Sequence, residues 1–191
     1  MPKKFLMGIA TLILVFALAA CGKSNDSSDH KNMDTGTKSD SSMNMDHMEH
    51  SSSGEIPKSL KVAENPTYKV GDKVILKTDH MEGMKGAEAT ISGAFDTIAY
   101  VVNYTPTTGG PVVKNHKWVI QEEIKDARDK TLKNGTEVTI EADHMEGMKG
   151  AKGEIVSSVK TTVYMVDYTP TTGGPVVKNH KWVTEDEISA K

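Results

Sequence analysis

A histidine and two methionines lie within five residues of one another, and this arrangement occurs twice in the chain. The string from Asp79 to Ala87, Asp-His-Met-Glu-Gly-Met-Lys-Gly-Ala, returns unchanged from Asp143 to Ala151, 64 residues later. Thioether sulfur is a soft, uncharged ligand that selects Cu(I), and imidazole binds copper in either oxidation state. The motif therefore predicts a copper site in each copy. The candidate ligands are His80, Met81, Met84, His144, Met145 and Met148.

The same motif also has a purely structural interpretation. Methionine most often fills gaps in a hydrophobic core, so both methionines could be core residues, with His80 a surface turn residue beside Asp79. Gly83 and Gly86 favour a loop that folds back, which would let His80 and Met84 converge on one ion. The motif alone does not decide between these interpretations.

The segment that precedes the two copies carries the same residue types. Residues 22–64 are rich in Ser, Asp, Asn, Lys and Gly, with no aromatic and almost no aliphatic residue before Ile56. Such a segment buries too little apolar surface to fold, so we expect a flexible tether without a core. Its own methionines and histidines then predict a further copper site, although chance composition is the alternative. The candidates are Met43, Met45, His47, Met48 and His50. Carboxylates among them leave Cu(II) or Zn(II) open.

The N-terminus has the features of a lipoprotein signal peptide. Lys3 and Lys4 precede an apolar run, Phe5 to Ala20, that is short for a membrane span. Leu18-Ala19-Ala20-Cys21 then matches a bacterial lipobox, with the one cysteine of the chain at the position that lipidation requires. We expect acylation of Cys21 and anchoring at the outer face of the cytoplasmic membrane; an ordinary signal peptide is the alternative.

Removal of that peptide limits the possible functions. The mature chain keeps no free thiol, so it has neither a disulfide nor a thiolate ligand. Loss of Lys3 and Lys4 lowers the basic residues from 23 to 21 against 26 acidic ones, a formal net charge of -5. No basic patch is present, which argues against nucleic acid as a partner. We find no catalytic motif, and we predict that the chain is not an enzyme.

The rest of the chain is a tandem repeat. Aligned at the 64-residue offset, residues 66–127 and 130–191 are identical at 35 of 62 positions. Alternating and β-branched segments predict short strands at residues 73–77, 98–104 and 116–119 and at their counterparts. We therefore expect an all-β chain of two tandem small SH3-like β-barrel repeats of about 60 residues. The predicted divisions are a signal peptide (1–20), a tether (21–64), and repeat domains at 65–128 and 129–191.

Two further repeated features are candidates for binding. His116 and Trp118, with His180 and Trp182, lie two apart on a predicted strand and so on one face. The indole could cap Cu(I) by a cation–π contact, but the favoured interpretation makes Trp a core residue and His its neighbour. The loop Thr105–Pro111 is predicted to be a structural turn, and its exact repetition also fits a partner-binding surface. Acidic residues Glu122 and Glu123 are expected at a solvated helix start.

These motifs resemble those of the YdhK family of Gram-positive lipoproteins, in the two repeats, the lipobox and the Met/His tether. The family includes lipoproteins similar to the copper-binding surface protein CopL, and this likeness implies copper binding. We expect an anchored lipoprotein that sequesters or buffers copper, Cu(I) in preference to Cu(II) or zinc, with a copper exporter or a cell-wall component as a possible partner. The alternative is a non-catalytic cell-envelope module whose paired domains bind wall polymer or a protein through the repeated loops.

Overall fold

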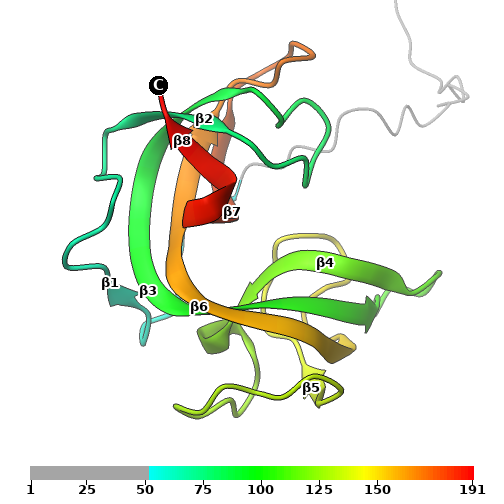
Figure 1. Cartoon of the computed structure of the whole chain (residues 1–191). Helices are drawn as coiled ribbons and strands as arrows, with labels where there is room; N and C mark the ends of the chain where they lie inside the picture. Colours follow the sequence, from blue (N-terminus) through cyan, green and yellow to red (C-terminus); the bar gives the residue numbers. More distant parts are fainter. Residues whose placement is uncertain (1–51) are drawn as a thin grey trace, which may run out of the picture. The chain divides into compact units, whose positions relative to one another are not determined.

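Strands form nearly all the regular structure in the computed structural model, which describes residues 52–191 (Figure 1). The strands are β1 (Lys61–Val62), β2 (Lys73–Leu76), β3 (Glu88–Thr105), β4 (Val113–Ile120), β5 (Glu137–Thr139), β6 (Lys152–Tyr168), β7 (Val177–Thr184) and β8 (Ile188–Ala190). Two single-turn 3-10 helices, η1 (Gln121–Glu123) and η2 (Glu185–Glu187), follow β4 and β7. The predicted all-β class is confirmed.

The long strands β3 and β6 form the centre of the sheet and lie side by side, antiparallel (Figure 1). The sequence predicted only short strands at 98–104 and 162–168, whereas β3 has 18 residues and β6 has 17. Thr97 pairs with Thr161, which is its own counterpart 64 residues later. The pairing therefore places a pseudo-twofold axis between the two strands, and this axis relates the two repeats.

This central pairing divides the sheet into two lobes, and each lobe takes strands from both repeats. Lobe A contains β2, the first half of β3, the second half of β6, β7 and β8, because β7 pairs with β6 and β8 with β2. Lobe B contains β5, the first half of β6, the second half of β3 and β4. Each core follows this division: Val74 and Tyr168 share one cluster, and Tyr104 and Ile140 share the other.

The sequence suggested two consecutive domains at 65–128 and 129–191, and the structure instead interlaces the repeats. The described strands form a single antiparallel sheet of order β5-β6-β3-β2-β8, with β1 and β4 paired to β3 and β7 paired to β6. A 60-residue unit has little apolar surface to bury on its own. Exchange of halves lets each lobe combine the apolar residues of both copies, and local strand patterns carry no signal for such an exchange.

A third apolar cluster is also built from both repeats. It contains Phe95, Trp118 and Trp182, with Leu60, Ala99, Val101, Ile120, Val163 and Met165. The ring of Phe95 meets Trp182 edge-to-face at 5.7 Å between centroids, a favourable aromatic geometry. Trp118 and Trp182 are 8% and 0% exposed, which confirms the interpretation of both indoles as core residues.

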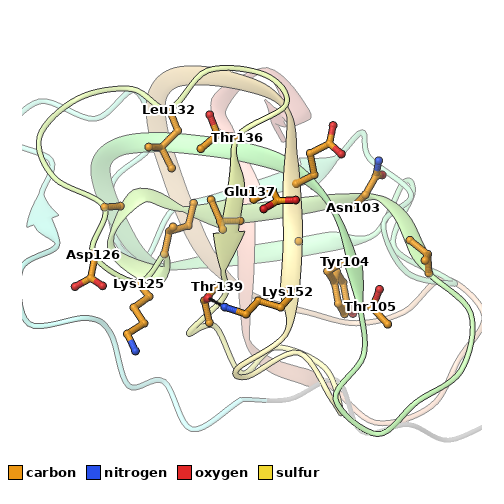
Figure 2. A pocket seen from close by; sticks show the side chains of 16 residues that line it. Asn103, Tyr104, Thr105, Lys125, Asp126, Leu132, Thr136, Glu137, Thr139 and Lys152 are labelled. Atoms are coloured by element: carbon orange, nitrogen blue, oxygen red, sulfur yellow. Dashed lines mark hydrogen bonds between the residues drawn. The ribbon is translucent and has the colours of Figure 1, made fainter.

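The two lobes differ at one edge. In lobe A, β8 continues alongside β2 as far as the pair Val74–Ala190. In lobe B the corresponding chain makes one bridge, Ile124 to Ile140, and then turns away at Asp126, whose φ is 58°. A cavity of about 760 Å³ lies there, between the segment 124–132 and strand β5 (Figure 2). None of the predicted ligands lines it, so it is not the candidate site.

The N-terminal predictions fall on residues that the structure does not describe. The signal peptide, Cys21 and the candidate ligands Met43, Met45, His47, Met48 and His50 all lie outside residues 52–191. Within the described residues, no helix has the length and apolar character needed to cross a membrane.

Candidate functional site

Four histidines and two methionines line one cavity of about 480 Å³, to which both repeats contribute. The six residues are His80, Met81, His116, His144, Met145 and His180. The remaining lining consists of Ser52, Asp79, Val113 and a polar rim of Lys114, Asn115, Lys117 and Lys181. We call this space the histidine cavity. The structure thus brings together side chains that the sequence assigned to separate sites in separate repeats.

The exactly repeated Thr-Pro-Thr-Thr-Gly-Gly-Pro loops hold the His-Met loops in place. Thr171 donates from its backbone N and its Oγ1 to the carbonyl oxygen of Gly83, at 2.8 and 3.1 Å. Thr107 makes the corresponding pair of bonds to Gly147 at 2.9 and 3.2 Å. Gly83 has a φ of 73°, and a Cβ there would meet Thr172 Oγ1 at 2.6 Å, so only glycine fits. Each Thr-Pro-Thr-Thr-Gly-Gly-Pro loop therefore binds the His-Met loop of the other repeat through part of its length.

A largely buried carboxylate, 12% exposed, holds the imidazole of His80. Glu187 Oε1 lies 2.8 Å from His80 Nε2, while Glu187 Oε2 accepts hydrogen bonds from Trp118 Nε1 at 2.7 Å and from the Thr184 backbone N at 3.0 Å. Burial alone would raise the pKa of Glu187, but the hydrogen bond and charge of His80 and the other two donors outweigh it and lower the pKa to about 2. We call Glu187, His80 and Trp118 the Glu187 group.

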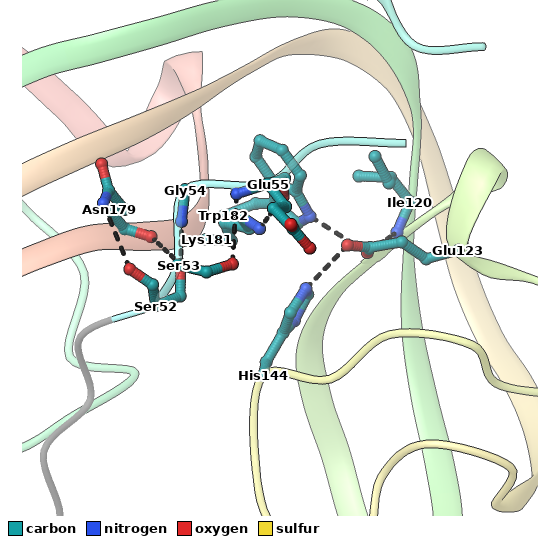
Figure 3. Close-up of polar contacts among 10 residues, drawn as sticks. All are labelled: Ser52, Ser53, Gly54, Glu55, Ile120, Glu123, His144, Asn179, Lys181 and Trp182. Carbon is teal, nitrogen blue, oxygen red and sulfur yellow. Dashed lines mark hydrogen bonds and ion pairs between the residues drawn. The ribbon is translucent and has the colours of Figure 1, made fainter. Parts of the chain in front are cut away.

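The pseudo-twofold axis repeats this arrangement around Glu123 (Figure 3). Glu123 Oε1 lies 2.8 Å from His144 Nε2, and Oε2 accepts from Trp182 Nε1 at 3.0 Å and from the Ile120 backbone N at 3.2 Å. We call Glu123, His144 and Trp182 the Glu123 group. In each group the histidine and tryptophan come from one repeat and the glutamate from the other.

The prediction that Glu122 and Glu123 form a solvated helix start is wrong for Glu123, which is 6% exposed. The sequence did contain a signal for it. Residues 120–127 and 184–191 differ between the repeats at most positions, yet glutamate stands at both 123 and 187 and isoleucine follows both. An acid retained where its neighbours differ pointed to a specific contact.

Three imidazole nitrogens of the cavity are buried without a hydrogen-bond partner among the described residues. They are Nδ1 of His80, Nδ1 of His144 and Nε2 of His116. Burial, followed by the nearby imidazoles of His144 and His80, lowers the pKa of His116 to about 4. His116 also packs edge-to-face on Tyr104 at 5.7 Å, as His180 does on Tyr168. Neutral imidazole with an unused lone pair is the form that binds metals.

The two methionines of each motif have different environments. Met81 and Met145 are partly exposed and line the histidine cavity. Met84 and Met148 are 0% exposed within the cores of lobes A and B and do not line it. The expected convergence of His80 and Met84 on one ion is therefore not what the structure contains, because core packing takes up that thioether.

The indole rings do not face an open cation position. Lys117 Nζ lies 5.1 Å from the ring centroid of Trp118, and Lys181 Nζ lies 5.9 Å from that of Trp182. A lysine ammonium thus already occupies the position that the sequence suggested for a copper ion over each indole. Trp118 and Trp182 instead contribute their N–H groups to the two glutamates.

The part of the predicted tether (21–64) that the structure describes is attached at the edge of the cavity. Ser52, which lines the cavity, donates from N to the Lys178 carbonyl at 2.9 Å and from Oγ to the Asn179 carbonyl at 2.7 Å. Asn179 Nδ2 donates back to the Ser52 carbonyl at 3.1 Å (Figure 3). Lys181 Nζ bonds the carbonyl of Glu55.

No group of three or more His, Cys, Asp or Glu side chains within residues 52–191 is arranged to hold a metal ion as it stands. The histidine cavity instead combines imidazole with thioether side chains. Lone pairs on imidazole nitrogen and methionine sulfur are the donors that copper accepts.

Comparison with known proteins places the chain among proteins of undefined function. A family model described as a protein of unknown function, DUF1541, matches residues 70–121 and 134–185. The uncharacterized protein YdhK of Bacillus subtilis strain 168 is 61% identical over 190 residues, which cover 98% of this chain and 90% of that protein.

Solved structures of that relative are similar to this chain as well. A crystal structure of a DUF1541 family protein, YdhK from Bacillus subtilis, is 67% identical with a TM-score of 0.73 and covers 75% of this chain and 97% of that one. A solution structure of the YdhK C-terminal domain is 72% identical with a TM-score of 0.62, over 64% of this chain and 93% of that one.

Proposed function

We propose that this chain, which belongs to the DUF1541 family, binds copper outside the cytoplasmic membrane and sequesters or buffers it. The observation that carries the proposal is the convergence of four histidines and two methionines from both repeats on one cavity. Three of the imidazole nitrogens there are buried and have no hydrogen-bond partner within residues 52–191. A buried polar atom without a partner costs free energy, and a metal ion would satisfy these atoms.

The donor set favours copper over other metals. Imidazole nitrogen with thioether sulfur suits Cu(I), whereas carboxylate and carbonyl oxygens suit Mg²⁺ and Ca²⁺. The carboxylates of Glu123 and Glu187, which contact two of these histidines, already accept hydrogen bonds through both of their oxygens. His80 with Met81, and His144 with Met145, would be the principal ligands, with His116 and His180 in support. Cu(II) or zinc bound by imidazole alone is the less favoured form of the same proposal.

The cellular setting is part of the proposal. Acylation of Cys21 would anchor the chain at the outer face of the cytoplasmic membrane, as in CopL-type copper-binding lipoproteins, and would leave residues 22–51 as a spacer. The tether residues Met43, Met45, His47, Met48 and His50 would bind copper as well, and a copper exporter or a wall component is a possible partner. We also propose that each lobe is a modified SH3-like barrel, because β3 and β6 bend strongly at the centre of the sheet (Figure 1).

The experiment is a Cu(I) titration of the mature chain against a competing chelator, beside a variant without residues 24–51. That deletion keeps Ser52 and its contacts to Asn179. We expect both proteins to compete with the chelator, with the shorter one losing only part of the stoichiometry. If neither competes, the copper proposal is wrong. If only the full mature chain competes, the histidine cavity is not the site.

One observation favours a second candidate function, a cell-envelope interaction module. The tips of the repeated loops remain exposed, including Val112 at 49% and Val176 at 45%. Exposed, exactly repeated loops on a rigid sheet suit recognition of wall polymer or a protein. In that case the deletion of residues 24–51 would leave the affinity for purified cell wall unchanged, and substitution of Val112 and Val176 by serine would abolish it.

A further inference from the structure

Glu187 and Glu123 use both carboxylate oxygens in the same way. In each, Oε2 accepts from one indole N–H and one backbone N–H, and Oε1 faces an imidazole Nε2 at 2.8 Å. The indole and backbone donors are fixed by the core and by the 3-10 turns η1 and η2. The side chain of each glutamate therefore has one orientation in which all its contacts are made.

This orientation determines which nitrogen of the imidazole carries the proton. An ionised carboxylate accepts hydrogen bonds and cannot donate them, and Oε2 of Glu187 already accepts from an indole N–H and a backbone N–H. In the neutral form that a metal requires, His80 must then present Nε2–H to Glu187, and its lone pair lies on Nδ1. That Nδ1 is the atom found buried and unpaired, and Nδ1 of His144 is its counterpart.

We propose that Glu187 and Glu123 are positioning residues for the metal: each holds a histidine of the other repeat as the Nε2–H tautomer and so makes Nδ1 the ligating atom of His80 and His144. This inference rests on the proposed copper function. Carboxylates that accept the second N–H of a ligating histidine orient the ring and raise its basicity, and their loss typically weakens metal binding about 10–100-fold. Because Nε2 keeps its proton, ligation at Nδ1 forms a metal–nitrogen bond without releasing a proton from the ring.

Each group combines a histidine and a tryptophan of one repeat with a glutamate of the other. His80 and Trp118 belong to the first repeat and Glu187 to the second, whereas His144 and Trp182 belong to the second and Glu123 to the first. Neither repeat can complete a group with its own residues. The copper affinity of either histidine therefore depends on the presence of both repeats in their interlaced arrangement.

Replacement of the two glutamates by glutamine tests the proposal without removing side-chain volume. A glutamine has one oxygen and one NH₂ group. At position 123 the amide oxygen must take the place of Oε2, where Trp182 and the Ile120 backbone both donate. The NH₂ group then faces His144 and forces its Nε2 to accept, so that the proton moves to Nδ1. At position 187 the amide oxygen is likewise required by Trp118 and the Thr184 backbone, so the NH₂ group faces His80.

The experiment compares the mature chain carrying Glu123→Gln and Glu187→Gln with a control carrying Glu122→Gln and Asp186→Asn. The control residues are the immediate neighbours of the two glutamates, and Glu122 accepts its hydrogen bond from Thr97. Long-range ¹H–¹⁵N spectra of the histidine side chains, recorded without metal, report the tautomer. Chelator competition with Cu(I) then reports the affinity.

We expect Nε2–H imidazoles for His80 and His144 in the parent and control proteins, and Nδ1–H imidazoles with about 10–100-fold weaker Cu(I) binding in the glutamine variant. An unchanged tautomer, or a changed tautomer with unchanged affinity, would overturn the proposal. If the parent protein itself does not bind Cu(I), the proposed function and the metal-positioning role both fail, while the spectra still show whether the glutamates set the tautomer.

Discussion

The Glu187 group and the Glu123 group have the same central contacts in different surroundings. In both, a glutamate joins an imidazole Nε2 to an indole Nε1 with distances between 2.7 and 3.0 Å. Around Glu187, Thr78 adds a hydroxyl at 3.3 Å and Lys117 an ammonium at 3.6 Å. Around Glu123, Ala142 replaces Thr78, and Lys181 bonds the carbonyl of Glu55 instead.

Contacts that both groups share are those that the glutamate–histidine–tryptophan arrangement requires, and contacts found in one group alone are not required. The glutamate, histidine and tryptophan are identical in both groups although the surrounding sequence has changed. The contacts of Thr78 and Lys117 with Glu187, in contrast, have no equivalent around Glu123 among the described residues. The shared contacts fix the imidazole rings of His80 and His144, which line the histidine cavity.

The largest difference between the groups should appear when the indoles are removed. Trp182 is 0% exposed and packs on Phe95, whereas Trp118 is 8% exposed. We expect Trp182→Ala to lower the free energy of unfolding by about 5 kcal/mol and Trp118→Ala by about 3 kcal/mol, measured by urea denaturation. Equal losses would mean that the two groups are equally packed.

The stability of the fold at low pH should depend on His116, whose pKa is lowered by burial and by the nearby imidazoles of both groups. Between pH 6.5 and about 4 the unfolded chain binds a proton on this ring that the folded chain does not, because the folded pKa is lowered to about 4. The free energy of unfolding therefore falls as the pH falls, by about 3 kcal/mol for this ring. His116→Gln should lack this loss between pH 7 and 4.

The low pKa of Glu187 acts in a different pH range, so the two effects can be separated. Its folded pKa of about 2 lies below the ordinary value of 4.5, and its stabilisation is present above pH 4.5 and is lost as the pH falls toward 2. His116→Gln should leave that second loss in place. If the variant and the parent lose stability identically between pH 7 and 4, His116 is not buried as a neutral ring.

Substitution of the methionines distinguishes ligands in the histidine cavity from residues that pack in the lobe cores. Met81→Leu with Met145→Leu should weaken Cu(I) binding about tenfold or more, equivalent to about 1.4 kcal/mol, and leave the fold intact. Met84→Leu with Met148→Leu should leave the affinity unchanged and cost less than about 1.5 kcal/mol of stability each. Chelator competition and urea denaturation measure the two effects. The reverse pattern would place the copper ligands in the cores.

The smallest effect should come from a substitution that makes the Glu187 group resemble the Glu123 group. Thr78→Ala removes the hydroxyl bond to Glu187 and makes that position equivalent to Ala142. We expect a loss of about 1 kcal/mol in the free energy of unfolding, while Thr78→Ser, which keeps the hydroxyl, should lose less. Thermal denaturation of the two variants provides the measurement. An equal loss in both would assign the effect to the methyl group of threonine.

Much of the local structure could be predicted from the sequence. Alternation and β-branched residues located strands at 73–77 and at 98–104, and Trp118 and Trp182 were correctly assigned to the core. The lengths of β3 and β6 were not predicted, because Ser92 to Asp96 lacks the apolar alternation of an ordinary strand. Pairing of β3 with β6 extends both strands through that segment, and pairing partners are a tertiary property.

The site could be predicted only in part for the same reason. The repeated motif identified His80, Met81, His144 and Met145, which do line one cavity. It could not separate Met81 from Met84, since burial depends on which side of the loop meets the core. The glutamates were missed because each acts on a histidine of the other repeat, and a repeat considered by itself contains no partner for them.

The most direct test of the account is a Cu(I) titration of the mature chain in which His80 and His144 are both replaced by glutamine, in competition with a chelator. The account predicts that the variant stays folded, loses the high-affinity copper bound in the histidine cavity, and retains only binding that disappears with residues 24–51. Undiminished high-affinity binding by the double variant without residues 24–51 would contradict it, because copper would then be bound at neither the cavity nor the tether.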